Sequence, residues 1–161
     1  MRLVIADTGP VNYLIQIDCI DLLPRIFERV VLPAAVQTEL SSPLAPPSVQ
    51  LWIADSPAWL EIAQTPAVTL STGIHKGEAA AIALAVAMHA DLLLIDDRRG
   101  MRAAKQQGLR VTGTLGLLDL AAERGLVDFA GAIRKLEGTS FRRPEALLQA
   151  MLDKHNRPDR S

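Results

Sequence analysis

Short runs of apolar residues, separated by longer helical stretches, constrain the fold of this chain more than any other feature. Strands that are apolar on both sides are typical of parallel sheets buried between helices, because the crossover between parallel strands is usually a helix. Five such runs are LVIA (3–6), VVL (30–32), LEIA (60–63), LLLI (92–95) and LRVT (109–112). Helices are expected over residues 11–17, 20–28, 34–40, 49–55, 78–89, 98–107, 115–124, 128–137 and 144–153. The pattern predicts an α/β domain whose parallel sheet is covered on both faces.

Length and composition favour one cytoplasmic domain. The chain has 161 residues, of which 49% are apolar, so disorder is not expected. We expect a single domain over 1–153 and a polar tail over 154–161. Cys19 is the sole cysteine, so no disulfide can form within the chain, and no apolar leader follows the first residues. The longest apolar helical run, 79–88, is too short to cross a bilayer, so no membrane association is expected.

The first strand runs directly into Asp7-Thr8-Gly9, which has two interpretations. Asp-Thr-Gly after an apolar strand is the signature of aspartic proteases, in which two aspartates share a proton. The same order also places a carboxylate at the end of the first strand of an α/β domain. Aspartic proteases are built of strands, whereas this chain has at least five helix candidates. The helical pattern therefore favours the second interpretation.

Further acids are expected at the same edge of the sheet. In open parallel sheets, ligands bind beyond the carboxyl ends of the strands. Asp7 follows the first strand, and Asp96 and Asp97 follow the strand over 92–95. Glu78 begins the Ala-rich helix, where an acid also favours the helix dipole, and Glu39 lies near the end of an earlier helix. The sequence does not show which strands are neighbours.

Such acids repel one another if the fold brings them together. Two carboxylates about 5 Å apart cost about 3 kcal/mol at an effective dielectric constant of about 20. A cluster of them persists when a cation occupies it. Histidine and cysteine residues are not clustered with these acids, and an all-oxygen site suits Mg²⁺ or Mn²⁺. Such an ion can activate water toward a phosphodiester.

The two parts of the chain differ in charge. Residues 1–97 hold 4 basic and 11 acidic residues, whereas residues 98–161 hold 13 and 7. Arg98, Arg102 and Lys105 share one face of an expected helix next to Asp96, where they could contact backbone phosphates or form a solvated face. The aromatic residues form no stripe that predicts base stacking: Tyr13, Phe27, Trp52, Trp59, Phe129 and Phe141.

Four stretches, in this order, carry a resemblance to a known family: VIADTGPVNYL (4–14), LPAAVQTEL (32–40), GEAAAIALA (77–85) and LLLIDDRRGMRAAKQQGLRVTGTLGLLDLAAERGLV (92–127). Together they resemble the PIN-domain nucleases, including the VapC-type toxins of prokaryotic toxin–antitoxin pairs. Within the family, the strongest resemblance is to a prokaryotic PIN-like subgroup. The resemblance implies a three-layer α/β/α sandwich with a central parallel sheet. It also implies an endoribonuclease that uses Mg²⁺ or Mn²⁺ and hydrolyses RNA phosphodiesters.

The resemblance also assigns roles to residues. It implies that five acids form the catalytic set, namely Asp7, Glu39, Glu78, Asp96 and Asp97. Of these, the metal ligands are Asp7, Glu78 and the last pair, within which we favour Asp96 as the principal ligand. A hydroxyl residue of the family falls on Thr112 or Thr114, and we favour Thr114, which could equally be a helix cap. With the basic helix face described above, the expected substrate-binding set is Thr8, Arg98, Arg102, Lys105 and Thr114.

One position departs from the family, and two other functions stay open. The family often has Ser or Asn two residues after the first aspartate, where this chain has Gly9, although Thr8 could substitute. Gly9 leaves open a weakly active or inactive module that only binds RNA or protein. A receiver-like phosphoacceptor would carry its acid pair early, whereas here the pair comes late. The resemblance implies RNA, an antitoxin protein and a second copy of the chain as partners.

Overall fold

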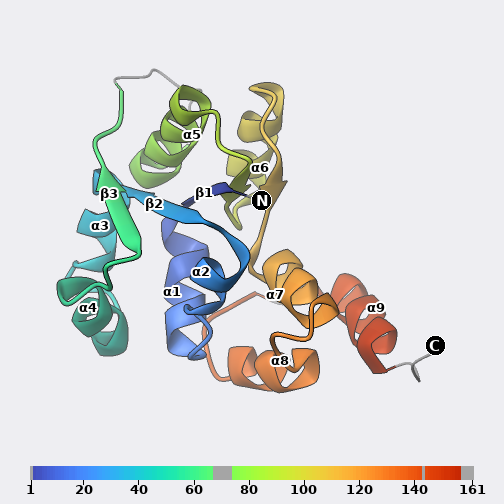
Figure 1. Ribbon diagram of the computed structural model, residues 1–161. Coiled ribbons are helices and arrows are strands. Elements are labelled where there is room, and N and C mark those ends of the chain that lie inside the picture. The colour runs from blue at the N-terminus through green and yellow to red at the C-terminus, as the bar shows by residue number, and fades with distance from the viewer. Residues whose placement is uncertain (1, 67–73, 143, 157–161) are drawn as a thin grey trace.

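The computed structural model describes residues 2–66, 74–142 and 144–156, and its sheet has five parallel strands. Their order across the sheet is β3-β2-β1-β4-β5, so β1 is central (Figure 1). The strands are β1 (Leu3–Ala6), β2 (Arg29–Pro33), β3 (Leu60–Ala63), β4 (Leu92–Leu94) and β5 (Val111–Thr112). All five lie on the apolar runs that predict them, and the α/β fold class is confirmed.

Nine helices connect or follow these strands in the described residues: α1 (Thr8–Gln16), α2 (Leu22–Ile26), α3 (Ala34–Leu40), α4 (Pro47–Ala54), α5 (Lys76–Met88), α6 (Arg98–Gln106), α7 (Thr114–Glu123), α8 (Phe129–Glu137) and α9 (Glu145–Asn156). Several expected bounds are wrong by a few residues. α1 begins directly after Asp7, and α9 continues to Asn156. Residues 154–156 of the expected tail are therefore helical, and 157–161 lie outside the described residues.

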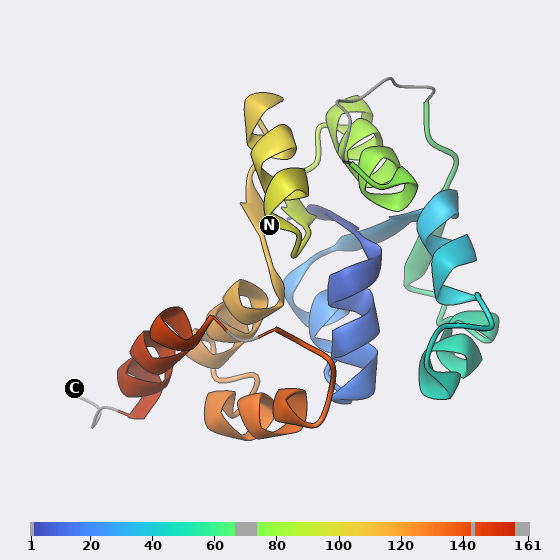
Figure 2. The same ribbon diagram turned by 180° about the vertical axis from the view of Figure 1, so that it is seen from behind.

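Alternate strand residues face two separate parts of the core. Val4 packs in one apolar cluster and its neighbour Ile5 in the other, because successive side chains of a strand point to opposite faces. One cluster includes residues of α5 and α6, and the other includes residues of α1, α2, α4 and α7. Figures 1 and 2 show the sheet between these two helical layers. The fold is thus a three-layer sandwich with a parallel sheet at its centre.

The strand order changes direction between β1 and β4. From β1 the chain adds β2 and β3 on one side, then crosses to β4 and β5 on the other. β1 and β4 pair in register Ala6↔Leu94, and the Asp7 N–H donates to the Leu94 carbonyl at 2.9 Å. Crevices at such reversals are the usual ligand sites of open α/β sheets. Asp7 and Asp96 lie at this reversal.

No helix in the described ranges 2–66, 74–142 and 144–156 combines the length and the apolar character that crossing a membrane would need.

Candidate functional site

Asp7 is the most buried acid of the site. Its side chain is 5% exposed, and its Oδ1 has no hydrogen-bond partner among the described residues. Burial raises the pKa of Asp7 from 3.8 to about 7, with further contributions from the charges of Glu78, Glu39 and Asp96, while the Thr8 N–H opposes the rise. A buried, unpaired carboxylate oxygen calls for a proton or a cation.

Asp96 is held from both sides by one residue of α7. Thr114 donates its backbone N–H to Oδ1 and its hydroxyl to Oδ2, each at 2.7 Å. Burial raises the pKa of Asp96, and these two bonds oppose the rise. Gly113 permits the arrangement, because a Cβ there would lie 2.6 Å from Oδ1.

Of the two expectations about Thr114, the helix cap is wrong and the substrate contact stays a prediction. Thr114 is the first residue of α7, whose N-cap is Gly113, and its hydroxyl makes no cap. Its side chain is fully buried and bonded to Asp96, so the geometry gives no support to direct substrate contact. Thr112, the other candidate, is half-buried and lies at the end of β5.

Glu78 and Asp97 approach each other from α5 and α6. Glu78 is 8% exposed, and its Oε2 also lacks a partner among the described residues. Burial raises the pKa of Glu78 to about 7, and the charge and hydrogen bonding of Asp97 add to the rise. Asp97 itself is exposed and caps α6, because its Oδ2 accepts the Gly100 N–H at 2.9 Å. Asp97 is thus a helix cap whose charge also acts on Glu78.

Glu39 reaches the same site from α3. The Thr8 hydroxyl donates to Glu39 Oε2, and the Glu39 carboxylate lies against Gly77 in the first turn of α5. The Glu39 charge raises the pKa of both Asp7 and Glu78. Thr8 is therefore engaged with an acid of the site, whereas its predicted contact with substrate stays a prediction.

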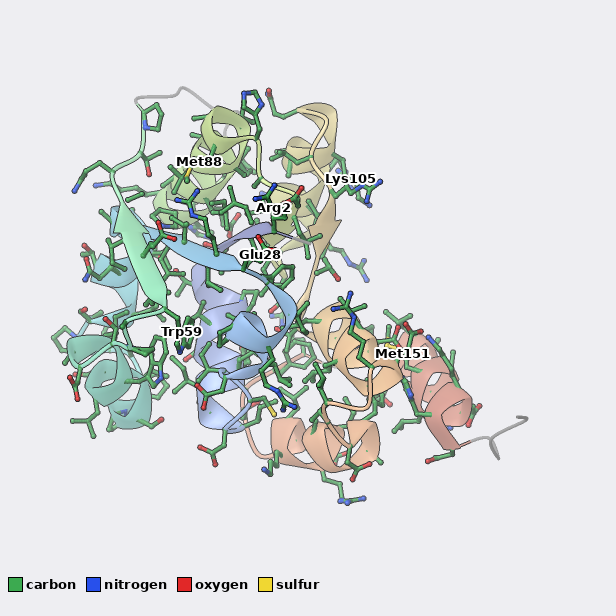
Figure 3. The ribbon with its side chains drawn as sticks, viewed as in Figure 1. Arg2, Glu28, Trp59, Met88, Lys105 and Met151 are labelled. Atoms are coloured by element: carbon green, nitrogen blue, oxygen red, sulfur yellow. The ribbon has the colours of Figure 1, made fainter. Side chains whose placement is uncertain are left out.

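A cleft of about 1500 Å³ opens over these acids. All five predicted acids line it, and so do Thr8 and Gly9. Figure 3 labels Lys105 on α6 and Met151 on α9, two elements that contribute to its walls. The lysines and arginines that line the cleft are Lys76, Arg98, Arg99, Lys105 and Arg142. Arg102 does not line it, so its predicted substrate contact has no support from the cleft.

The match with a family of known proteins is nearly complete in length. The family model described as PIN domain matches residues 3–157. The chain belongs to the PIN-domain family. PIN domains are typically nucleases and usually use divalent metal ions. Comparison with curated proteins gives no significant match.

Among solved structures, this PIN domain is similar to a PilT N-terminus domain protein from the hyperthermophilic archaeon Sulfolobus solfataricus P2. The two chains share 16% sequence identity with a TM-score of 0.54, and the match covers 76% of this chain and 95% of the other. At this level of identity the likeness concerns the fold.

The acids of this PIN domain fit a divalent cation by chemistry, although they do not form a closed cage. In the described residues no three His, Cys, Asp or Glu side chains are already close enough together to hold a metal ion. Two buried carboxylate oxygens, Asp7 Oδ1 and Glu78 Oε2, nevertheless lack partners. The pKa of Asp7, Glu78 and Asp96 is raised, so each would gain from a nearby positive charge. Oxygen donors of this kind suit Mg²⁺ or Mn²⁺.

The cleft of the PIN domain also contains residues that the sequence did not single out. Lys76, Arg99 and Arg142 add basic side chains. Lys76 and Arg99 lie close to Glu78 and Arg98 in the sequence, whereas no local signal points to Arg142. Tyr13 and Phe141 line the same cleft with their ring centroids 5.1 Å apart. They are distant in the sequence, so no local pattern could have identified the pair.

Proposed function

We propose that this PIN domain is a divalent-metal-dependent endoribonuclease that hydrolyses RNA phosphodiesters. The observation that supports this most is the convergence of buried acids at the strand-order reversal. Asp7 and Asp96 follow adjacent strands, and Glu78 approaches from α5 with an unpaired carboxylate oxygen. A site of this charge over an open cleft suits a cation and a phosphate together.

In this proposal, Asp7, Glu78 and Asp96 hold the Mg²⁺ or Mn²⁺, with Asp97 close by. When bound, the ion would polarise the phosphodiester and promote ionisation of a water. Thr114 orients Asp96, and Thr8 orients Glu39 through its hydroxyl. Arg98 and Arg99 begin α6 beside the acids and line the cleft, where they can bind backbone phosphates.

We also propose that the protein is the toxin of a toxin–antitoxin pair, with an antitoxin protein as its partner. The support is the similarity of its motifs to VapC-type toxins. A second copy of the chain is proposed on the same ground.

Cleavage by matched variants tests the catalytic proposal. Wild-type protein should cleave a panel of RNAs when Mn²⁺ or Mg²⁺ is present and should not cleave them in EDTA. Removing partners of metal ligands typically costs about 10–100-fold. Loss of a ligand in Asp7→Asn should therefore reduce the rate by about 100-fold or more. Asp55→Asn, at an exposed position after α4, is the control and should cleave like wild type.

A second measurement does not depend on activity. Because a ligand that binds only the folded state stabilises it, Mn²⁺ should raise the melting temperature of wild type and of Asp55→Asn. It should raise that of Asp7→Asn much less. Equal cleavage by wild type and Asp7→Asn, or equal stabilisation by Mn²⁺, would contradict the proposal.

The alternative is a catalytically weak module that binds RNA or protein. Gly9 favours this alternative. The family often carries a polar side chain at this position, and such a side chain would begin 3.5 Å from Asp96 Oδ2. With Gly9, this chain has no side chain there to support the acid. RNA binding without cleavage by any variant, with either metal, would support it.

A further inference from the structure

We propose that Tyr13 and Phe141 form a stacking wall, against which the cleft binds an unpaired base of single-stranded RNA. This inference rests on the proposed function in taking RNA as the ligand, and it adds which residues of the cleft receive a base.

The wall is formed by two segments that are remote in the sequence. Tyr13 lies on α1, and Phe141 lies in the connection between α8 and α9, which runs beside α1 in both views (Figures 1 and 2). The rings meet edge to face, with centroids 5.1 Å apart and planes at 81°. The Tyr13 hydroxyl and Ser140 Oγ lie 3.1 Å apart, within hydrogen-bond distance. Both rings are half-buried and line the cleft, so parts of them face it.

The cleft also has apolar lining from α9. Leu147 and Met151 line the same cleft, and Leu147 is 49% exposed. Together with the two rings, these side chains give part of the cleft an apolar lining. An apolar lining of this kind suits a flat, weakly polar group.

The cleft that contains the wall also has positively charged side chains, which can bind the phosphates of RNA. Arg142 follows Phe141 directly, and Arg98, Arg99 and Lys105 line the same cleft. The acids begin at Asp7, which precedes Tyr13 by six residues, or about 9 Å along a helix axis. One strand of RNA could thus place its phosphates on the basic side chains, one phosphodiester at the acids and a neighbouring base on the rings.

Stacking of this kind requires bases that are free. Proteins that bind single strands combine a positively charged groove with aromatic side chains, whereas bases in a duplex are stacked on one another. The combination of rings and cations in one cleft favours single-stranded RNA over duplex RNA.

The test uses the full-length protein in EDTA, so that RNA is not cleaved, and a short single-stranded RNA that carries one 2-aminopurine. The fluorescence of this base is quenched when it stacks, so wild-type protein should reduce it on binding. Phe141→Leu keeps an apolar side chain but removes the ring. It should relieve the quenching and weaken binding about fivefold or more. Trp59→Leu is the matched control, because Trp59 pairs with Trp52 and does not line this cleft (Figure 3).

Each outcome decides the proposal. Quenching that is lost in Phe141→Leu and kept in Trp59→Leu supports it, provided that both variants melt cooperatively. Quenching that is equal in wild type and Phe141→Leu overturns it, as does equal affinity for duplex RNA. If single-stranded RNA does not bind at all, the proposal is also overturned, and the rings would then be a binding site for a protein segment. Metal-dependent cleavage without this signal refutes the wall alone, whereas the signal without cleavage refutes the nuclease alone.

Discussion

At the scale of single residues, the site is a set of carboxylates in an environment that opposes their charge. Asp7 and Glu78 are nearly as buried as the apolar core, and each has an oxygen without a partner in the described residues. The pKa of each is raised to about 7, with burial as the largest cause. The folded protein without a cation is therefore destabilised by ionising these groups.

This predicts a specific pH dependence for metal-free protein. Between about pH 4 and pH 7 the folded state holds a proton on Asp7 that the unfolded state has released, because the pKa rises from 3.8 to about 7 on folding. Stability therefore falls as the pH rises through this window, by on the order of 4 kcal/mol for Asp7 alone. Asp7→Asn cannot ionise, so in EDTA it should melt several degrees above wild type at pH 8 and close to wild type at pH 4.

Thermal melting of both proteins at several pH values measures this difference. Asp55→Asn should follow wild type throughout. If the difference in melting temperature between Asp7→Asn and wild type is the same at pH 4 and pH 8, ionisation of Asp7 does not destabilise the folded state.

At the scale of elements, glycines let helices and loops approach the carboxylates. Gly77 occupies the first turn of α5, and a Cβ there would lie 2.6 Å from Glu39 Oε2. Gly113 does the same for Asp96 at the start of α7. In the first turn of a helix, a carboxylate is also favoured by the helix dipole. These close approaches explain how α3 and α5 can share one acidic site.

Gly77→Ala tests this packing. In an ordinary helix the change stabilises by about 1 kcal/mol. Here the added methyl group displaces the Glu39 carboxylate and breaks its hydrogen bond with the Thr8 hydroxyl. In the wild-type background, Gly77→Ala should therefore lower the free energy of unfolding by about 1–2 kcal/mol. In a Glu39→Ala background the same change should be neutral or stabilising. Denaturant unfolding of the four proteins gives the coupling, and equal effects in both backgrounds would contradict it.

At the scale of the whole molecule, opposite charges from the two parts of the chain meet at one cleft. Residues 1–97 supply Asp7, Glu39 and the other acids, whereas every lysine and arginine lining the cleft except Lys76 comes from residues 98–161. Acids at the base of a basic cleft suit a cation and a polyanion at once. The charge asymmetry of the sequence is thus concentrated at the site.

This arrangement predicts how RNA binding responds to salt. For single strands, each phosphate contact adds about 0.7 to the slope of log affinity against log salt. Arg99→Gln should therefore lower that slope by about 0.7 in EDTA, because Arg99 lines the cleft. Arg134→Gln, exposed on α8 and outside the cleft, is the control and should leave the slope unchanged. Equal slopes for wild type and Arg99→Gln would exclude a phosphate contact there.

The order of residues along the chain is enough to predict the elements and the edge on which their acids lie. Apolar runs of the right length predict buried strands, and in a parallel sheet the residues after the strands share one edge. The strand pattern alone therefore assigns Asp7 and Asp96 to the same edge. These are local properties, because burial of a strand depends mainly on its own residues.

Which elements become neighbours is settled only when the whole chain packs. The pairing of β1 with β4 brings Asp7 beside Asp96, and packing of α7 turns Thr114 from an expected cap into the partner of Asp96. The contact between Tyr13 and Phe141 likewise arises between remote segments. Such contacts depend on how separate elements share one core, and no periodicity within a single element encodes that.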